Sequence, residues 1–434
     1  MYNLVSFAGI IILMAFAWLF STNRKVVNWR VVVWGVVIQF MFAIFIFILP
    51  AGAKIFMLIN DAVVKIVDVA STGTKFIFGR LALPPGTIDE WGGESLGFIF
   101  AFQALPTVIF FASLMGVLYY LGIMPRLIRL FSKIFTKLMR VSGAESLCAS
   151  SNVFVGIESA TTIRPYLERM TRSELCTILT AGMATIASSV LAIYVMILQN
   201  QFSTIAGHLV SASFLSAPAA IVMSKLLMPE TEKPETLGMD VKPYYDKESS
   251  LIEATINGAN AGVKLVIGII ALLIAFLGLV ALIDFIFTGI GLKLNNFFGI
   301  QMDWSLKGLL GYVFYPFTLV IGVPPSDAME IAKLIGERVI VTETKSYMDL
   351  AVLISDGALI DPRSAFLATY ALCGFAHVAS LAIFVGGIAA LVPKRTGDLS
   401  AMGPRALLAA TLACLMTASV AGTFFTGSSI LLGK

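Results

Sequence analysis

Two acidic residues follow breaks in stretches of sequence that are otherwise apolar. Glu158 ends the segment 155–158 (VGIE), and Asp327 ends the segment 322–327 (GVPPSD). A carboxylate at membrane depth is costly, and a chain retains one mainly where it binds a polar substrate or an ion. Two such breaks in corresponding places of two halves indicate a secondary transporter whose site lies between the broken segments.

The composition indicates that most of the chain lies in a membrane. Of its 434 residues, 58% are hydrophobic and 13% are charged, and the mean hydropathy is +0.91. A soluble domain is usually about 45–50% apolar and about 25% charged. The net charge of +4 comes from basic residues near the ends of apolar segments. Such residues indicate how the protein is oriented in the membrane, and they give no reason to expect a nucleic-acid partner. The four cysteines show neither disulfide nor metal-site spacing.

Apolar runs of about 20 residues or more predict eight membrane spans, and hence an all-α integral membrane protein. The runs are 2–21, 31–53, 95–122, two within 175–223, 261–292, 364–391 and 406–432. The basic loop between the first two spans is expected in the cytoplasm. Five basic residues between 126 and 140 share one helical face, which is typical of an interfacial helix at the headgroups.

Two further segments are apolar but too interrupted to span the membrane. Residues 143–169 break at Gly156, and residues 307–337 break at 322–325. Non-helical backbone survives at membrane depth only where it lines a protein cavity, so each segment is expected to form a re-entrant hairpin. The polar loop 228–250 separates two halves of similar order: a hairpin, a polar-interrupted helix and a straight helix. This order predicts an inverted repeat.

Oxygen-bearing groups near the breaks are candidates for a cation site. Asn152 and Thr185 offer side-chain oxygens, and helix breaks free carbonyl oxygens, as at Val155 and Ile186. Oxygen ligands suit a hard cation such as Na⁺. Structural alternatives stay open, because Asn152 could cap its helix and a threonine hydroxyl can bond to its own helix.

His377 stands in the interrupted stretch 374–380, between Phe375 and Ser380. It could bind a ligand or be a hydrogen-bonded core residue, and Phe375 could offer its ring to a planar ligand or pack in the core. His377 and Ser380 are spaced closely enough for nucleophilic chemistry. No orienting acid or oxyanion motif is near them, so an enzyme is not expected.

At these residues the chain resembles the concentrative nucleoside transporters, which include bacterial Na⁺/nucleoside cotransporters. The resemblance runs from Asn23 to the C-terminal end of the sequence. Its motifs include 100–122 (FAFQALPTVIFFASLMGVLYYLG), 228–234 (MPETEKP), 321–324 (IGVP), 371–376 (ALCGFA) and 391–395 (LVPKR).

The resemblance implies a homotrimer in which each protomer has a scaffold domain and a transport domain that moves like an elevator. Residues 1–140 would hold scaffold and interfacial helices, and residues 141–227 the first transport repeat. Residues 228–304 would hold the polar loop and a scaffold helix, and residues 305–434 the second transport repeat.

The resemblance also implies roles for individual residues. Glu158 matches a glutamate that binds the nucleobase, Asp327 matches a glutamate that holds ribose hydroxyls, and His377 replaces an asparagine that also binds ribose. The residues expected around the substrate are Gly156, Ile157, Glu158, Val190, Asp327, Phe375, His377 and Ser380. Those expected around Na⁺ are Asn152, Val155, Thr185 and Ile186. The tip 156–160 (GIESA) is shorter than the family's tip and lacks its glutamine, threonine and proline, so the nucleobase end is altered.

The sequence therefore predicts a symporter of the cell inner membrane that imports nucleosides with Na⁺ and associates with its own copies and with lipid. A proton-coupled transporter of nucleosides or of related nucleobases or ribosyl compounds is the nearest alternative, with Glu158, Asp327 or His377 titrating. A channel is a further alternative, but two inverted hairpins suit alternating access better than a continuous pore.

Overall fold

The computed structural model describes residues 1–89, 92–245 and 248–426. All the secondary-structure elements assigned within these ranges are helices. Seven of the described helical segments are long and apolar enough to cross a membrane. They are Tyr2–Leu19, Trp29–Phe47, Phe100–Tyr120, Arg172–Leu198, Ile205–Leu227, Leu251–Phe298 and Pro393–Thr423. This architecture agrees with the all-α membrane protein expected from the composition.

The eighth expected span, 364–391, consists of two shorter helices. They are α15 (Pro362–Leu372) and α16 (Val378–Leu391), and the chain between them is extended. Gly374, in this break, has a φ of 151°, and a Cβ built there would lie 2.7 Å from the Cys414 sulfur and 2.8 Å from the Ala184 carbonyl oxygen. A glycine is therefore required at this close approach.

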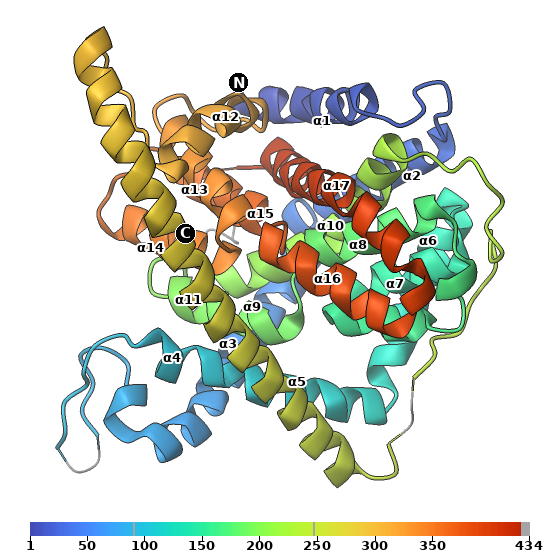
Figure 1. Cartoon of the computed structure of the whole chain (residues 1–434). Helices are drawn as coiled ribbons and strands as arrows, with labels where there is room; N and C mark the ends of the chain where they lie inside the picture. Colours follow the sequence, from blue (N-terminus) through green and yellow to red (C-terminus); the bar gives the residue numbers. More distant parts are fainter. Residues whose placement is uncertain (90–91, 246–247, 427–434) are drawn as a thin grey trace.

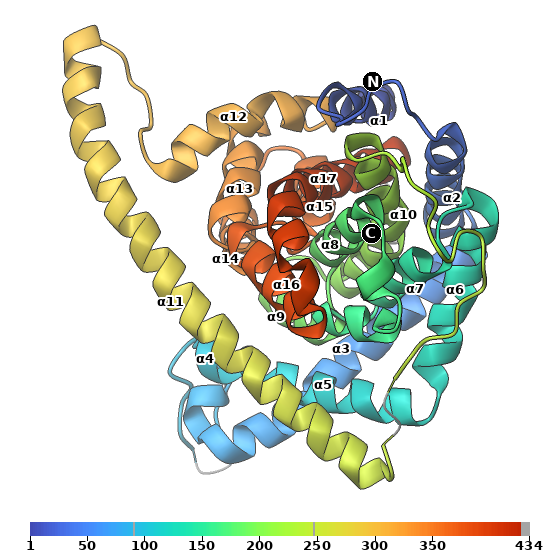
Figure 2. The ribbon, with the colours of Figure 1, turned by 45° about the vertical axis from the view of Figure 1, so that its right-hand side comes forward.

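Six helices form the outer part of the molecule. They are α1 (Tyr2–Leu19), α2 (Trp29–Phe47), α3 (Pro50–Phe78), α4 (Phe100–Gln103), α5 (Leu105–Tyr120) and α11 (Leu251–Phe298). The long helix α11 runs obliquely along one side of the molecule and packs mainly on α5 (Figures 1 and 2). Helices α1 and α2 pack on the inner helices α17 and α10, respectively.

The chain between α5 and the polar loop consists of helical segments separated by two breaks, and the first of these helices lies at the periphery (Figure 2). In order they are α6 (Ile123–Met139), α7 (Gly143–Asn152), the 3₁₀ segments Ile157–Ile163 and Leu167–Arg169, α8 (Arg172–Ala184), α9 (Ser188–Leu198) and α10 (Ile205–Leu227). Local capping sets their starts: the Ser142 side chain accepts from the Glu145 amide, and Thr171 and Glu174 form a capping box at α8. The breaks lie at 153–156 and 185–187.

The second half repeats this order. It comprises α12 (Leu306–Val320), α13 (Ala328–Ile340), α14 (Glu343–Ser355), α15, α16, the 3₁₀ turn Pro393–Arg395 and α17 (Thr396–Thr423). In both halves a helix interrupted in its middle (α8/α9, α15/α16) precedes a long one (α10, α17). The segment 307–337, predicted to be the second hairpin, forms α12 and most of α13, and a further turn at Val341–Thr342 joins α13 to α14.

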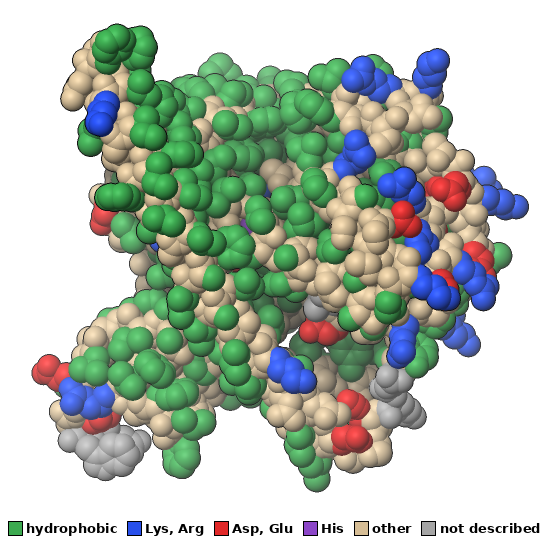
Figure 3. Space-filling model, viewed as in Figure 1, with side chains coloured by type: hydrophobic (Ala, Val, Ile, Leu, Met, Phe, Trp, Pro, Cys, Tyr) green, Lys and Arg blue, Asp and Glu red, His purple; other side chains and the backbone are tan. Residues whose placement is uncertain are grey.

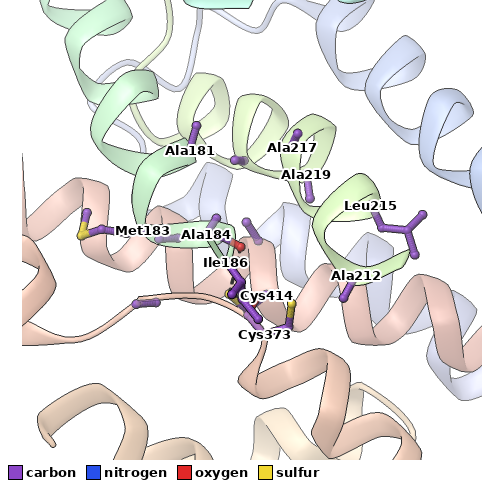
Figure 4. Packing of buried hydrophobic residues seen from close by; sticks show 14 of the residues in the cluster. Ala181, Met183, Ala184, Ile186, Ala212, Leu215, Ala217, Ala219, Cys373 and Cys414 are labelled. Atoms are coloured by element: carbon purple, nitrogen blue, oxygen red, sulfur yellow. Dashed lines mark hydrogen bonds between the residues drawn. The ribbon is translucent and has the colours of Figure 1, made fainter. Parts of the chain in front are cut away.

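Small residues fill the contact between the two interrupted helices. Figure 4 shows Ala184, at the end of α8, and Ile186, in the 185–187 break, near Cys373 and Cys414. The Cys414 thiol lies 3.3 Å from the Cys373 carbonyl oxygen and 3.8 Å from that of Ala184. Because these side chains are small and fully buried, the two breaks approach closely in the core.

Two buried cations join distant parts of the chain. Lys225 of α10, 5% exposed, lies 2.8 Å from the Glu145 carboxylate of α7, which is 1% exposed. The Arg363 guanidinium donates to the carbonyl oxygens of Tyr2, Gly322 and Gly422. Arg363 thereby joins α1, the 321–327 break, α15 and the end of α17.

Basic side chains gather at one end of the molecule, on the right of Figure 3, and the rest of that face is largely hydrophobic. Several of them pair across segments, as in Arg129 with Asp240 and Lys394 with Glu168, both within 2.9 Å. A basic end of a membrane protein normally faces the cytoplasm.

Candidate functional site

A central cavity of about 110 Å³ lies where four breaks in the helices meet. The breaks are 153–156, 185–187, 341–342 and 373–377. The lining residues from these breaks and the helix turns after them are Gly156, Glu158, Ala187, Ser189, Val190, Thr342, Glu343, Thr344, Phe375, His377 and Ser380. Apolar side chains of α11, among them Leu265 and Ile269, close the opposite wall. The cavity therefore combines converging polar groups with an apolar wall.

Most of the residues expected around a substrate line this cavity. Gly156, Glu158 and Val190 come from the first half of the chain. Phe375, His377 and Ser380 come from the second half and complete the set. The side chain of Ile157, also expected there, lies outside the described residues.

Asp327 is not brought to the cavity, contrary to the prediction. Its carboxylate accepts hydrogen bonds from the backbone amides of Ile360 and Asp361, at 3.2 and 3.0 Å, and from the Ser364 hydroxyl at 2.6 Å. The side chain is 1% exposed. Its oxygens thus fix the start of α15, and the polar break at 321–327 packs against α1 through Ser6 and Arg363.

Glu343 is the acidic residue of the second half that faces the cavity. Tyr194 donates to its Oε1 at 2.6 Å, and the Thr344 hydroxyl lies 3.2 Å from the same oxygen. The other oxygen, Oε2, lies 2.8 Å from Nε2 of His377 but receives no well-aligned hydrogen bond from any described residue. Glu343 is 4% exposed, so a buried acceptor remains available at the cavity.

His377 is held in one orientation by the helix that it begins. Its Nδ1 accepts from the backbone amide of Ser380 at 3.2 Å, which makes His377 the N-cap of α16. Since Nδ1 accepts, Nε2 is the nitrogen that carries the proton in the neutral ring. Nε2 lies 2.7 Å from the Ser380 hydroxyl as well as near Glu343. Donor and acceptor groups are therefore fixed side by side.

Three helices present their first turn to the cavity. These are α9, through Ser189 and Val190, α14, through Thr342 and Glu343, and α16. The N-terminus of a helix carries a partial positive charge, which stabilises an anion there. This arrangement offsets part of the cost of keeping the Glu343 carboxylate in an apolar protein.

The four residues expected around Na⁺ lie at two adjacent breaks. The backbone amide of Ser188 donates to the Phe154 carbonyl at 3.1 Å, which joins the 153–156 break to the 185–187 break. Asn152 uses its Oδ1 to accept from Ser159 at 2.9 Å, and the Thr185 hydroxyl donates to the Ala181 carbonyl at 2.9 Å.

One carbonyl oxygen at each of these two breaks is available to bind a cation. Within the described ranges, no hydrogen bond reaches the carbonyl oxygen of Val155 or of Ile186. Each side-chain oxygen of Asn152 and Thr185 retains a lone pair beyond its present bond. The donor set is thus all oxygen, which suits Na⁺.

A polar cavity buried where several interrupted helices meet, inside a largely apolar helical protein, defines a membrane transport protein. Family models support this class over most of the chain. The model of the C-terminal part of Na⁺-dependent nucleoside transporters matches residues 208–422, the model of their N-terminal part matches residues 8–81, and a model described as nucleoside recognition matches residues 101–201. The chain belongs to the Na⁺-dependent nucleoside transporter family, which confirms the resemblance and the expected ion.

Relatives span the whole chain. It is 37% identical to an uncharacterized transporter of Haemophilus influenzae over 97% of both chains. It is 33% identical to the nucleoside permease NupC of Helicobacter pylori, over 97% of this chain and 98% of that one. It is 37% identical to solute carrier family 28 member 3 of Mus musculus, but spans 58% of that longer protein. The relatives are transporters and permeases, so this protein is not an enzyme.

Solved structures share the fold. CNTnw in an inward-facing, substrate-bound state matches with a TM-score of 0.86, at 35% identity and over 98% of both chains. A variant of CNTnw in an outward-facing state matches with a TM-score of 0.84, at 34% identity.

Proposed function

We propose that this protein is a secondary active symporter that imports nucleosides with Na⁺ across the cell inner membrane. One observation carries the proposal: the central cavity has a buried carboxylate, Glu343, in one wall and a second carboxylate, Glu158, in another. A nucleoside has vicinal hydroxyls on its ribose and N–H groups on its base. Both kinds of group donate hydrogen bonds to carboxylates.

The ribose is assigned to Glu343, His377 and Ser380. Glu343 Oε2 accepts from a ribose hydroxyl, and the His377 and Ser380 pair offers both donor and acceptor capacity. The base then lies along Val190 and Phe375, with Glu158 accepting from its edge. A site that pairs a buried polar group rejects ligands lacking the partner group more strongly than an apolar wall rejects isosteres.

Sodium is assigned to Asn152, Thr185 and the carbonyl oxygens of Val155 and Ile186. An ion there bridges the two breaks that also supply Gly156 and Ser189 to the central cavity. Ion binding therefore fixes the shape of the substrate site. The ion raises substrate affinity, and the substrate must raise ion affinity by the same factor.

The moving unit comprises residues 141–227 and 305–434, whose breaks enter the membrane as re-entrant hairpins at α7 and at α13–α14. Helices α1 and α2 pack on α17 and α10, so they accompany this unit. The scaffold comprises α3, α5 and α11. Side chains of α11 such as Ile267 and Phe285, 61% and 78% exposed, are left for lipid and for two further copies in a homotrimer.

Proton coupling is the second candidate, and the pair His377 and Glu343 favours it. An imidazole and a carboxylate, two of the groups that most often transfer protons in proteins, lie 2.8 Å apart in the substrate site. The two candidates differ in the gradient that drives uptake.

Purified protein in liposomes separates the candidates. Labelled nucleoside is offered with an inward Na⁺ gradient, with choline in place of Na⁺, and with an inward proton gradient. The proposal expects accumulation above the external concentration only with the Na⁺ gradient. Accumulation driven by the proton gradient alone would show that H⁺, and not Na⁺, is the coupling ion. Equilibration of nucleoside without accumulation under every gradient would contradict symport.

A further inference from the structure

A second cavity, of about 400 Å³, adjoins the central one. This volume lies in the range of about 300–1,000 Å³ that is usual for small-molecule sites. Its walls come from α5, the 154–164 segment, the loop before α11 and the first turns of α11. Gly156, Glu158 and Ser189 line both cavities. The two cavities therefore meet beside the group assigned to the base.

The partition between the cavities is thin. Gly156 has no side chain, and a Cβ built there would lie 3.4 Å from the Ala187 Cβ and 3.5 Å from a Glu158 carboxylate oxygen. Ser189 is small. Among the described residues, none forms a hydrogen bond or an ion pair with the Glu158 carboxylate. A group bonded to this carboxylate therefore has open space on the side away from the central cavity.

The walls of the second cavity carry aromatic rings. Tyr119 and Tyr120 come from α5, and Tyr245 comes from the loop before α11. In the described part of the chain, these three rings make no contact with another ring. The loop is held in place by the Tyr244 amide, which donates to the Thr162 carbonyl at 2.8 Å. Tyrosine rings stack on planar or apolar groups and keep their hydroxyls hydrated.

We propose that the protein binds nucleosides whose exocyclic base amine carries an apolar or aromatic arm, with that arm in the second cavity. The inference rests on the proposed function, which places the base at Glu158. A monosubstituted amine keeps one N–H to donate to Glu158, and its substituent passes between Gly156 and Ser189. Bulk on the ribose hydroxyls is excluded, because Glu343 is enclosed by Tyr194, Thr344 and His377.

Competition for uptake of labelled adenosine by the protein in liposomes tests this inference. The competitors are N6-benzyladenosine, N6,N6-dibenzyladenosine, which has no N–H, and 2′-O-benzyladenosine. N6-Benzyladenosine is expected to compete as well as adenosine, and the other two about tenfold or more weakly. If the protein prefers cytidine, the N4-benzyl and 2′-O-benzyl cytidines replace them.

Filling the second cavity supplies the matched variants. Ala261, on α11, lines the second cavity but not the central one, and Ala261→Phe places a ring there. In this variant, N6-benzyladenosine should compete about tenfold or more weakly, and the uptake of adenosine should be unchanged. Val263→Phe is the control, since Val263 is on the same helix, is 40% exposed and lines neither cavity. Tyr245→Ala should likewise weaken the competition by N6-benzyladenosine and leave the uptake of adenosine unchanged.

The outcomes separate this inference from the proposed function. Uptake of adenosine without competition by N6-benzyladenosine would overturn the inference alone. If Ala261→Phe and Tyr245→Ala each lowered the affinity for adenosine and for N6-benzyladenosine equally, the arm would lie elsewhere. That result would also overturn the inference. Absence of uptake of every nucleoside tested would remove the proposed function and this inference together.

Discussion

Replacing Glu343 by glutamine should lower nucleoside affinity while the fold survives. The amide retains an oxygen that accepts from Tyr194, which donates to Glu343 at 2.6 Å, but it loses the negative charge beside His377. A hydrogen bond to a charged group contributes about 1.5–3 kcal/mol, against about 0.5–1.5 kcal/mol for a neutral pair. The one ribose hydroxyl assigned to Oε2 therefore loses about 1–1.5 kcal/mol, or roughly 5–13-fold in Kd.

The assay is nucleoside binding to the purified protein in Na⁺, followed by thermal shift or calorimetry, with the Tm of the ligand-free protein as the measure of folding. Asp327→Asn is the matched control, because Asp327 holds the amides of Ile360 and Asp361 and lies away from the cavity. It should leave Kd unchanged and lower the free energy of unfolding by about 1–3 kcal/mol. A Glu343→Gln variant with the Kd of the unmodified protein would refute the ribose assignment, as would an Asp327→Asn variant that loses affinity at unchanged Tm.

Three further substitutions test the neighbouring features. Asn152→Ala should reduce the stimulation of uptake by Na⁺ relative to choline more than it reduces protein abundance, and equal stimulation would remove Asn152 from the sodium site. His377→Asn should retain uptake, because the amide can still cap α16, whereas His377→Leu should not; equal uptake by both variants would show that a polar side chain is not needed at this position. Glu145→Gln removes the nearer of the two carboxylates beside the buried Lys225, leaving Glu230 at 3.5 Å, and should lower the free energy of unfolding by at most about 3–5 kcal/mol, while the double variant Glu145→Leu, Lys225→Met should be milder. Thermal unfolding in detergent checks this last pair, and a double variant less stable than the single one would contradict the reasoning.

The sequence predicted the first half of the site better than the second. Gly156 and Glu158 were found because the break that carries them interrupts a largely apolar stretch, and His377 and Ser380 were found for the same reason. Val190, in contrast, was expected only from the family resemblance. All of them line the central cavity. The sodium residues stay a prediction, although their two breaks are adjacent.

Glu343 was missed because its surroundings resemble a water-exposed segment. Between 337 and 349 the sequence is rich in charge, yet Lys307 and Lys345 bind the carboxylates of Glu337 and Asp349 in one network. These charges neutralise one another, and hydropathy cannot show that. The available signal was local: an apolar run, 339–341, followed by Thr342, which caps α14.

Asp327 was selected because its break has the same local pattern as the break at Gly156. Glycine and proline specify that a helix stops, but the depth of that point depends on the packing of the whole chain. At 321–327 the partners are α1 and Arg363. Gly322 has a φ of 91°, and a Cβ there would lie 2.3 Å from the Ser6 hydroxyl oxygen. Gly322 therefore allows the break to approach α1 closely.

Arg363 also bears on the order in which the protein is completed during synthesis. Its guanidinium donates to the carbonyl oxygens of Tyr2 and Gly422, which are 420 residues apart in the sequence, so the second acceptor is synthesised long after the first. Until the last helix has entered the membrane, the arginine lacks one acceptor and α1 lacks a major packing partner. A chain stalled before residue 422 therefore holds an incompletely paired cation among apolar helices, which is costly at membrane depth. The side chain that joins α1 to α17 in the folded protein is thus fully paired only after α17 is in place.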